Sequence, residues 1–383
     1  MRSKKLSAML FMSAMMLSLT ACGDAKQPEV KVEEDFTLTV ERDEPQSTKE
    51  AETTPSVEEI QSETQETVVE EVNREGMYRS ELTNEWIDEA LKNQRPIAVM
   101  VDNEKIALPH YGLTEADVVY EIMNSTANNR ITRLMAVVKD WGKITQFGSI
   151  RSARQTNFML AAEWNAVVCH DGGPFYINEW VAKDYTNNFS GTFGRVDNGK
   201  AREYTEYICE GDLEKNFKNK GYSIEYNEFY PGQHFTFASS EVDLATEVTA
   251  VDATHVELPF YHNDSMLDYN ETTGTYDYSE YGKQHVDPLH DNAVLSFENV
   301  ILQDCTFAKL DSNGYLIYNC IDGGRDGYYL TNGKAIPIVW VKESETAPTK
   351  FYNKATGEEI QLNTGKTYIA LVPSDTWDEV VIQ

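Results

Sequence analysis

The sequence lacks the short motifs that usually identify an enzyme or a metalloprotein. It contains no Cys-x-x-Cys pair, no glycine-rich phosphate-binding loop, no dinucleotide fingerprint and no zinc motif. The stretch Gly148–Gln155 also lacks the second glycine of a hydrolase nucleophile elbow. We therefore predict no cofactor and no metal, and we assign no catalytic residue. His285–Asp287 and His290–Asp291 contain metal-ligating residue types, but we interpret them as surface turns.

Basic residues are scarce as well. The chain has 33 Lys and Arg against 63 Asp and Glu, for a formal net charge of −30. So acidic a chain is a poor partner for nucleic acid or for anionic lipid. Any local cluster of arginines is therefore more informative here than it would be in a basic protein.

Long apolar runs are absent except at the N-terminus. Basic residues at positions 2, 4 and 5 precede a short apolar run, Met9–Leu19, and the sequence then reads Leu-Thr-Ala-Cys. This order resembles a bacterial lipoprotein signal, which predicts removal of residues 1–21 and lipidation of Cys22, palmitate included. The alternative is an ordinary secretory signal with an incidental cysteine. We expect a protein anchored by lipid to the extracytoplasmic face of the cell membrane.

The following segment, residues 23–75, has seventeen acidic and five basic residues and only one aromatic residue. A segment of this composition buries too little apolar surface to offset the entropy of ordering, and its like charges extend it. We predict a disordered acidic tether, with an acidic interaction tail as the alternative.

Cysteine is rare, and four cysteines remain if Cys22 is lipidated. Outside the cytoplasm these four could form disulfides. The candidate pair is Cys305 and Cys320, which share a β-rich region, and free buried thiols are the equally weighted alternative. The other two cysteines are Cys169 and Cys209.

The remaining chain predicts an α+β fold with two domains. Residues 76–245 alternate buried-strand patterns with helix-like patterns, which indicates a mixed α/β sheet domain. Residues 285–383 contain closely spaced strand patterns and an Asn332-Gly333 hairpin turn, which indicates a smaller β-rich domain. Residues 246–284 are interpreted as a linker with the first strands. The predicted strands are 97–103, 117–123, 131–138 and 166–170, and the predicted helices are 80–93, 156–164 and 202–221.

The most informative stretch is Gly148–Asn157, "GSIRSARQTN". Ser152 and Gln155 match a helix capping box, so Ser152 is predicted to cap the helix that follows. Arg151 and Arg154 then lie beside a helix N-terminus, where a cation is unfavourable unless an anion compensates it. That anion could be an external ligand, held by the arginines and free backbone N–H groups. It could equally be an internal carboxylate, Asp102 or Glu121.

A second strand end lies at "VVCHDGGP". His170 and Asp171 end a predicted strand, and Gly172–Gly173 allow a close backbone approach before a helix that begins at Pro174. Ligands of α/β sheets bind beyond the carboxyl ends of strands. We therefore predict that this turn faces the arginines across one crevice. Asp102, at a third strand end, could also form an acid–base pair with His170, although His170 could equally be a backbone-bonded turn residue.

Several segments resemble the YerB-type lipoprotein family. They are "RPIAVMVDN", "GLTEADVVYEI", "ITRLMAVV", "GSIRSARQTNFMLAAEWNAVVCHDGG" and "PTKFYNKATGEEIQLNTGKTYIALVPSD", which together span most of residues 95–375. The resemblance implies a lipid-anchored protein with two domains, and it implies no settled activity. The positions that match the signature of the first domain are Asp102, Asn103, Glu121, Thr132, Arg133, Arg151, Ser152, Arg154 and His170.

The chain departs from that family in two places. It reads Ala107-Leu108-Pro109-His110 where the family usually has Ala-Arg-Pro-Gln. A histidine of a second signature is missing from "AREYTEYI", which begins at Ala201. Any mechanism that needs that histidine is therefore in doubt for this chain.

These observations favour a binding protein. The predicted crevice offers arginines but no nucleophile beside an evident base. We expect it to hold an anionic envelope component, a peptidoglycan or teichoic-type glycan. The alternatives are an envelope-assembly enzyme of the phosphotransferase or hydrolase kind, and an adaptor that binds another envelope protein through the C-terminal β domain.

Overall fold

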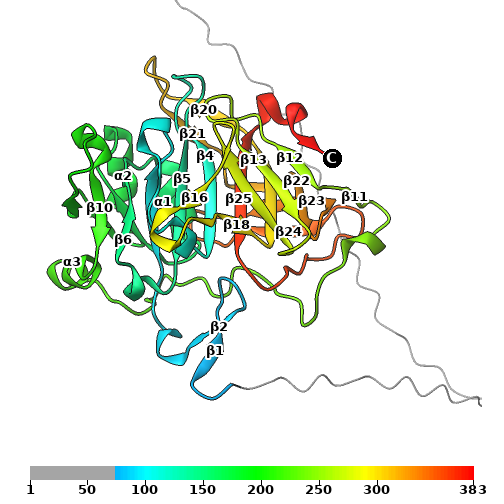
Figure 1. The fold of residues 1–383 in the computed structure, drawn as a ribbon, viewed down its shortest axis with the longest axis horizontal. Coiled ribbons are helices and arrows are strands. Elements are labelled where there is room, and N and C mark those ends of the chain that lie inside the picture. Colours follow the sequence, from blue (N-terminus) through cyan, green and yellow to red (C-terminus); the bar gives the residue numbers. More distant parts are fainter. Residues whose placement is uncertain (1–73) are drawn as a thin grey trace, which may run out of the picture. The chain divides into compact units, whose positions relative to one another are not determined.

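The computed structural model describes residues 74–383, and Cys22 and the predicted tether (23–75) lie outside this range but for its last two residues. Strands are more common than helices (Figure 1), in agreement with the α+β class. The main sheet has eleven strands in the order β11-β23-β22-β19-β25-β4-β5-β3-β7-β8, with β24 beside β23. The strands are β3 (Ile97–Asp102), β4 (Val118–Met123), β5 (Thr132–Val138), β7 (Val167–His170), β8 (Asn188–Ser190), β11 (Val251–Asp252), β19 (Asn299–Cys305), β22 (Asp322–Thr331), β23 (Lys334–Lys342), β24 (Lys350–Asn353) and β25 (Thr367–Pro373).

The main sheet is continuous between the two regions predicted as domains. β25 lies between β19 and β4 and runs parallel to both. Its pairing with β4 joins Thr367 to Val118 and Leu371 to Ile122, about 250 residues apart in sequence. The N-terminal and C-terminal regions therefore share one sheet, whichever residues bound each region.

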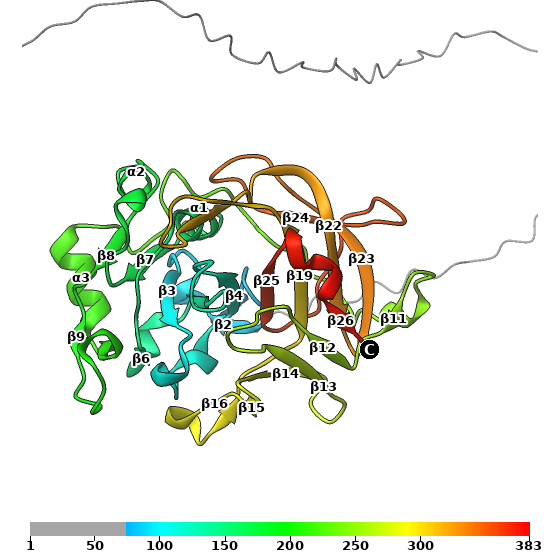
Figure 2. The same ribbon diagram turned by 90° about the horizontal axis from the view of Figure 1, so that it is seen from above.

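Both faces of the main sheet are covered. β3 is buried along its whole length: Val99 and Val101 belong to one apolar cluster, and Ala98 and Met100 belong to the other. This explains why the strand reads as a continuous apolar run without alternation. Figure 2 shows α1 on one side of β3 and β4, and β13 and β14 on the other.

One covering layer is a six-stranded sheet that belongs largely to the segment interpreted as a linker. Leu267, Tyr276 and Tyr278 of this layer are fully buried, so the segment is part of the core. Its strands are β12 (His255–Glu257), β13 (Met266–Asn270), β14 (Thr275–Glu280), β15 (Lys283–Gln284), β18 (Ser296–Phe297) and β26 (Val381–Ile382).

The opposite face is covered by the helix α1 (Gln155–Ala162), all of whose residues are buried. A helix that is buried on every side is typical of a core element. Short pairs and two more helices complete the fold: β1 (Met77–Arg79) with β2 (Trp86–Asp88), β6 (Gln146–Gly148) with β10 (Glu206–Cys209) and β9 (Gly194–Arg195), β16 (Val286–Asp287) with β17 (Ala293–Val294), β20 (Phe307–Lys309) with β21 (Leu316–Tyr318), α2 (Asn178–Val181) and α3 (Asp212–Lys220).

Four strands and the helix after Arg154 lie where the sequence predicts them, and the Asn332-Gly333 turn joins β22 to β23 with both residues at positive φ. Two helix predictions are wrong. Residues 80–93 form a β1–β2 turn and a short 3-10 segment, because Ser80 Oγ accepts the Leu82 N–H and Asn84 adopts φ 58°. Residues 202–221 are interrupted by β10, which pairs with β6, before α3 begins beyond Gly211.

Cys305 and Cys320 do not form a disulfide, so the equally weighted alternative of free thiols is correct. All four described cysteines are free thiols, and only Cys209 is not fully buried. The Cys305 thiol donates to the carbonyl of Asn319, while the Cys320 thiol lies 3.9 Å from the sulfur of Met159. Among the described residues, no helix is long and apolar enough to cross a bilayer.

Candidate functional site

The loop Ser149–Arg154 crosses the carboxyl ends of β3 and β7. The Arg151 N–H donates to the carbonyl of Met100, and the Asp171 N–H donates to the carbonyl of Arg151. The Ala153 N–H then donates to the carbonyl of Gly172. These hydrogen bonds fix the loop between two strand ends, which is where the sequence predicts a site.

Ser152 does not cap the helix, in contrast to the prediction. Arg154 is the residue before α1, and its N–H donates to the Asn157 side-chain oxygen at 2.7 Å. Because Asn157 occupies the third helical position, it supplies the capping interaction from inside the helix. Ser152 contributes its carbonyl group, which accepts a 2.7 Å hydrogen bond from Nη1 of Arg133.

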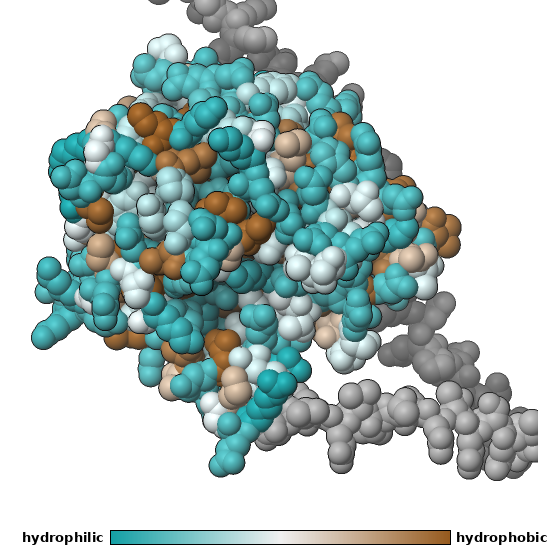
Figure 3. All heavy atoms as spheres, in the orientation of Figure 1, coloured by the Kyte–Doolittle hydropathy of each residue, from teal (hydrophilic) through white to brown (hydrophobic). Residues whose placement is uncertain are grey.

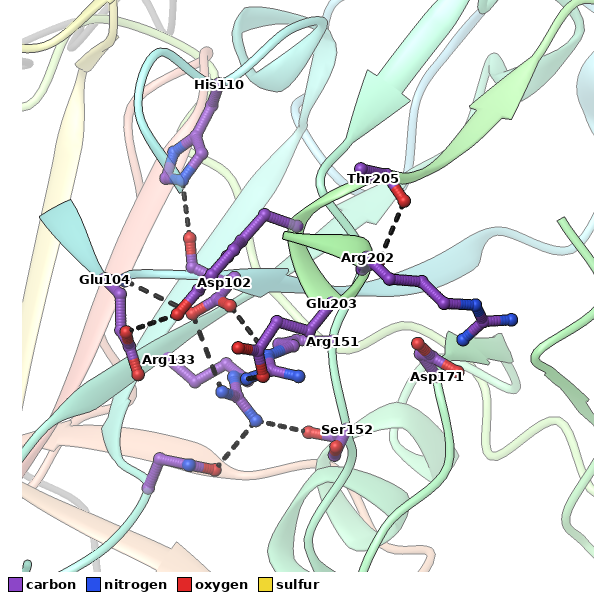
Figure 4. Close-up of polar contacts among 12 residues, drawn as sticks. Asp102, Glu104, His110, Arg133, Arg151, Ser152, Asp171, Arg202, Glu203 and Thr205 are labelled. Carbon is purple, nitrogen blue, oxygen red and sulfur yellow. Dashed lines mark hydrogen bonds and ion pairs between the residues drawn. The ribbon is translucent and has the colours of Figure 1, made fainter. Parts of the chain in front are cut away.

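Arg151 has internal carboxylate partners. Its Nε lies 2.8 Å from Oδ2 of Asp102, and its Nη2 lies 2.6 Å from Oε2 of Glu203 (Figure 4). Asp102 is fully buried, whereas the Glu203 side chain is half-exposed. The internal alternative is therefore correct for this arginine, and Asp102 is its main compensator.

Arg133 also forms an ion pair with Asp102, but at a longer distance. Its Nη2 lies 3.7 Å from Oδ1 of Asp102, and its Nη1 is 3.4 Å from the side-chain oxygen of Asn124. The side chain is 5% exposed, and Nε has no hydrogen-bond partner. Burial lowers the pKa of this guanidinium below its ordinary value, and the Asp102 charge opposes that shift.

Arg154 has no carboxylate partner among residues 74–383. Its Nε donates to the carbonyl of Asn124 at 3.3 Å, its Nη1 donates to the carbonyl of Ala153 at 2.9 Å, and its guanidinium lies over the ring of Tyr315. Burial, and then repulsion by Arg133, lower the pKa of Arg154 to about 9. It remains protonated at neutral pH, as an incompletely compensated cation.

A small hollow separates Arg133 and Arg154. Its volume, including the part open to solvent, is about 230 Å³. The enclosed space holds about one water molecule. Two of its polar lining residues are the arginines least compensated by carboxylates. The hollow is lined by Ile122, Met123, Asn124, Arg133, Arg154, Thr156, Asn157, Leu316 and Tyr318.

The second predicted strand end is built differently. The carboxylate of Asp171 lies 2.8 Å from Nη2 of Arg195. His170 is buried: its Nδ1 bonds the Gly172 carbonyl at 2.7 Å and its Nε2 lies 3.3 Å from the side chain of Asn188. The protein itself thus satisfies both polar side chains of this strand end.

His170 and the glycine turn do not line the hollow. A Cβ atom on Gly173 would lie 2.9 Å from the Ala153 carbonyl, so the close approach that this glycine permits is to the protein's own loop. Burial lowers the pKa of His170 below its ordinary value. No hydrogen bond in the described structure joins His170 to Asp102. The predicted opposite wall is therefore wrong, and the alternative for His170, a turn residue bonded to the backbone, is correct.

Glu121 lies at the centre of a separate buried network with Thr132 and Asn103. Its carboxylate accepts hydrogen bonds from side chains of both halves of the chain and faces no cation in the described structure. It therefore cannot be the compensator of Arg154. The donors are Asn103, Thr132, Asn263, Ser265, Tyr278 and Tyr368.

Sequence reasoning missed several residues that line the hollow or contact Arg154. Asn124 precedes no recognisable motif, and Tyr315 and Tyr318 come from the region around β21, more than 150 residues after Arg154. Nothing in the local sequence pattern connects them to the arginines. The only local signal was Asn157, at the end of the arginine-containing stretch.

Comparisons with known proteins agree with this architecture. Residues 82–223 match the domain described as "Protein of unknown function (DUF3048) N-terminal domain", and residues 256–369 match the corresponding C-terminal domain. The chain belongs to the DUF3048 family. Every residue of the arginine cluster and of the hollow lies within these two matches, and Leu316 and Tyr318 come from the second.

A Bacillus subtilis (strain 168) protein of similar sequence has the name "Putative lipoprotein YerB". It is 26% identical over 311 residues, which are 79% of this chain and 86% of the relative. The crystal structure of the YerB protein from Bacillus subtilis aligns with a TM-score of 0.67 at 21% identity, over 80% of this chain and 99% of that one. This likeness shows that the two proteins share a fold.

Proposed function

We propose that this DUF3048 protein is a lipid-anchored extracytoplasmic protein that binds an anionic group of the cell envelope in the hollow between Arg133 and Arg154. The anionic group is a carboxylate or a phosphate, as found on peptidoglycan stems and teichoic-type polymers. The lipoprotein name of the Bacillus relative and the signal ending at Cys22 support the anchoring. The hollow supports the binding.

The observation that carries the proposal is the charge of the cluster. The guanidinium groups of Arg133, Arg151 and Arg154 lie together. The two nearby carboxylates, Asp102 and Glu203, form their shortest ion pairs with Arg151. Arg154 is left with two backbone carbonyls and a tyrosine ring, although it is partly buried. A bound anion would stabilise such a guanidinium, because it would supply the negative charge that no carboxylate of the described chain provides.

The geometry of the donors favours an oxyanion. Arg133 has an Nε–H without a partner, and Arg154, whose Nε and Nη1 donate to backbone carbonyls, adds its Nη2 group at the same hollow. Guanidinium forks match the two oxygens of a carboxylate or phosphate. One oxygen of such a group would enter the hollow, while the rest of the ligand stays on the surface, which is largely hydrophilic on the face seen in Figure 3.

Binding to purified cell walls tests the proposal. Intact walls should retain the parent chain. Arg154→Gln should weaken this binding by about tenfold or more, because it removes at least one charge-assisted hydrogen bond. Arg202→Gln is the matched control: it removes the same charge from an exposed position near the cluster. Walls stripped of teichoic polymers separate the two sources, because a stem carboxylate survives the stripping and a polymer phosphate does not. Equal binding by both variants would refute the proposal.

A further inference from the structure

Two histidines and a glutamate form a buried cluster apart from the arginines. His110 lies in the loop after β3, Glu280 ends β14, and His285 follows β15. One ligand-capable atom from each residue lies within 4.8 Å of those of the other two. The residues are 0%, 2% and 4% exposed, and the imidazole centroids are 5.0 Å apart.

The hydrogen bonds of this cluster fix which ring nitrogens carry protons. Nε2 of His110 lies 2.6 Å from the carbonyl oxygen of Asp102, which only accepts, so the proton is on Nε2 and Nδ1 has a free lone pair. Nδ1 of His285 lies 2.9 Å from Oε1 of Glu280, and these two atoms share one hydrogen bond.

Each of the three residues consequently has one buried polar atom without a hydrogen-bond partner. These atoms are Nδ1 of His110, Nε2 of His285 and Oε2 of Glu280. Asn103 and Asn263 flank the Glu280 carboxyl group, but Oε2 receives no hydrogen bond from them. An unsatisfied buried polar atom costs on the order of 1–3 kcal/mol, so three in one cluster require an explanation.

The electrostatics of the cluster favour neutral imidazoles. Burial lowers the pKa of His285 to about 4, and burial together with His285 lowers the pKa of His110 to about 4. Neutral imidazole is the form that binds metal ions. Burial raises the pKa of Glu280 to about 8, although His110, Asn263 and Asn103 oppose this rise.

We propose that His110, Glu280 and His285 bind a divalent first-row transition metal ion of the Zn²⁺ class. Two imidazoles and one carboxylate are a donor set that such ions prefer. The Asp102 carbonyl orients the ring of His110 from behind, as partners of metal-ligating histidines do. In the metal-bound form, the ion would replace the hydrogen bond between Nδ1 of His285 and Glu280, so that both groups face it.

The metal would join the two halves of the chain. His110 comes from the region matched by the N-terminal family domain, and the other two ligands come from the C-terminal one. The neighbouring acidic residue Asp287 is not part of the site, because its oxygens accept from Thr114 and from the Leu289 N–H. This inference is independent of the proposed anion binding.

Calorimetric titration of the metal-free full chain with Zn²⁺ tests the site. We expect one ion per chain and a rise in melting temperature of about 5 °C at saturating metal. His110→Gln and Glu280→Gln should each weaken binding by more than about 100-fold, since even removal of an orienting partner costs 10- to 100-fold. His255→Gln is the control: this exposed histidine lies beside Glu257 and Asp268 and would account for surface binding.

Three results would overturn the inference: no stoichiometric binding, loss of binding in His255→Gln, or unchanged binding in both cluster variants. Circular dichroism of the metal-free variants verifies that they fold. If neither folds, Co²⁺ bound to the parent chain gives the answer. Visible bands from nitrogen and oxygen ligands alone support the site, whereas a thiolate charge-transfer band would assign the metal to the free cysteines.

Discussion

Nε of Arg151 lies 2.8 Å from Oδ2 of the fully buried Asp102, while Arg154, three residues later, faces no carboxylate of the described chain. Two neighbouring arginines of one loop therefore have different roles. Arg151 is part of the scaffold, and Arg154 is the residue that we assign to a ligand.

The two arginines should respond oppositely to truncation. Arg151→Ala strands the buried charge of Asp102, with only the more distant Arg133 beside it, and should cost about 3–5 kcal/mol of unfolding free energy. Arg154→Ala removes a cation repelled by Arg133 and strands no carboxylate, so its cost should stay below about 1 kcal/mol. Urea unfolding of both variants measures the contrast. Equal destabilisation would place Arg154 in the scaffold as well.

A second prediction concerns acid stability and Glu163. Oε1 of this fully buried carboxylate lies 2.9 Å from Nζ of the buried Lys342, and its other oxygen bonds His234. Burial alone would raise the pKa of Glu163, but the charge of Lys342 and the hydrogen bond from His234 outweigh burial and lower it to about 2.

Because the pKa is lower in the folded state, Glu163 stabilises the fold above its ordinary pKa of 4.5. We expect roughly 3 kcal/mol of this stability to disappear as the pH falls from about 4.5 to 2. Glu163→Gln should cost about 3–5 kcal/mol at pH 7, since it strands Lys342. It should also flatten the pH dependence of the unfolding free energy in that window. Glu345→Gln, at a surface ion pair with Lys183, is the control and should leave the slope unchanged.

A third prediction concerns the anchor. Cys22→Ala should remove the lipid-attachment site and release the protein from membranes, or leave it unprocessed. Fractionation and electrophoretic migration detect either outcome. A variant that fractionates and migrates like the parent would contradict lipidation at Cys22.

A fourth prediction concerns the acidic segment. Limited proteolysis should remove residues 23–75 first and leave a resistant fragment that begins near Met77, where β1 starts. Because β25 pairs with β4, we expect this fragment to unfold as one unit. N-terminal sequencing and calorimetry measure the two outcomes. Early cleavage between β14 and β19 into two stable pieces would argue for independent domains.

The sequence predicted the elements whose pattern is local. β3, β4, β5 and β7 were found because strands buried on both faces read as continuous apolar runs. The short helix predicted over residues 80–93 was wrong because a few apolar residues at helical spacing also fit a hairpin whose turn is held by Ser80 and Asn84. Propensity and periodicity cannot separate the two in a segment this short.

The candidate site was predictable only in part. The strand ends and the arginine stretch were visible, since loops at strand ends carry sites in such folds. The partners of the two arginines could not be predicted, because Asp102 is 49 residues from Arg151 and Tyr315 is farther still from Arg154. His110 likewise meets Glu280 and His285 only through the pairing of the two halves of the chain.

The affinity of Arg154→Gln for a soluble envelope fragment tests the central claim most directly. Wall fragments released by a muramidase, labelled and titrated with the full chain, give dissociation constants by fluorescence anisotropy. We predict an increase of about tenfold or more for Arg154→Gln, and a constant within twofold of the parent for Arg202→Gln. Parent-like affinity in Arg154→Gln, with the variant folded, would contradict the assignment of the hollow as the binding site.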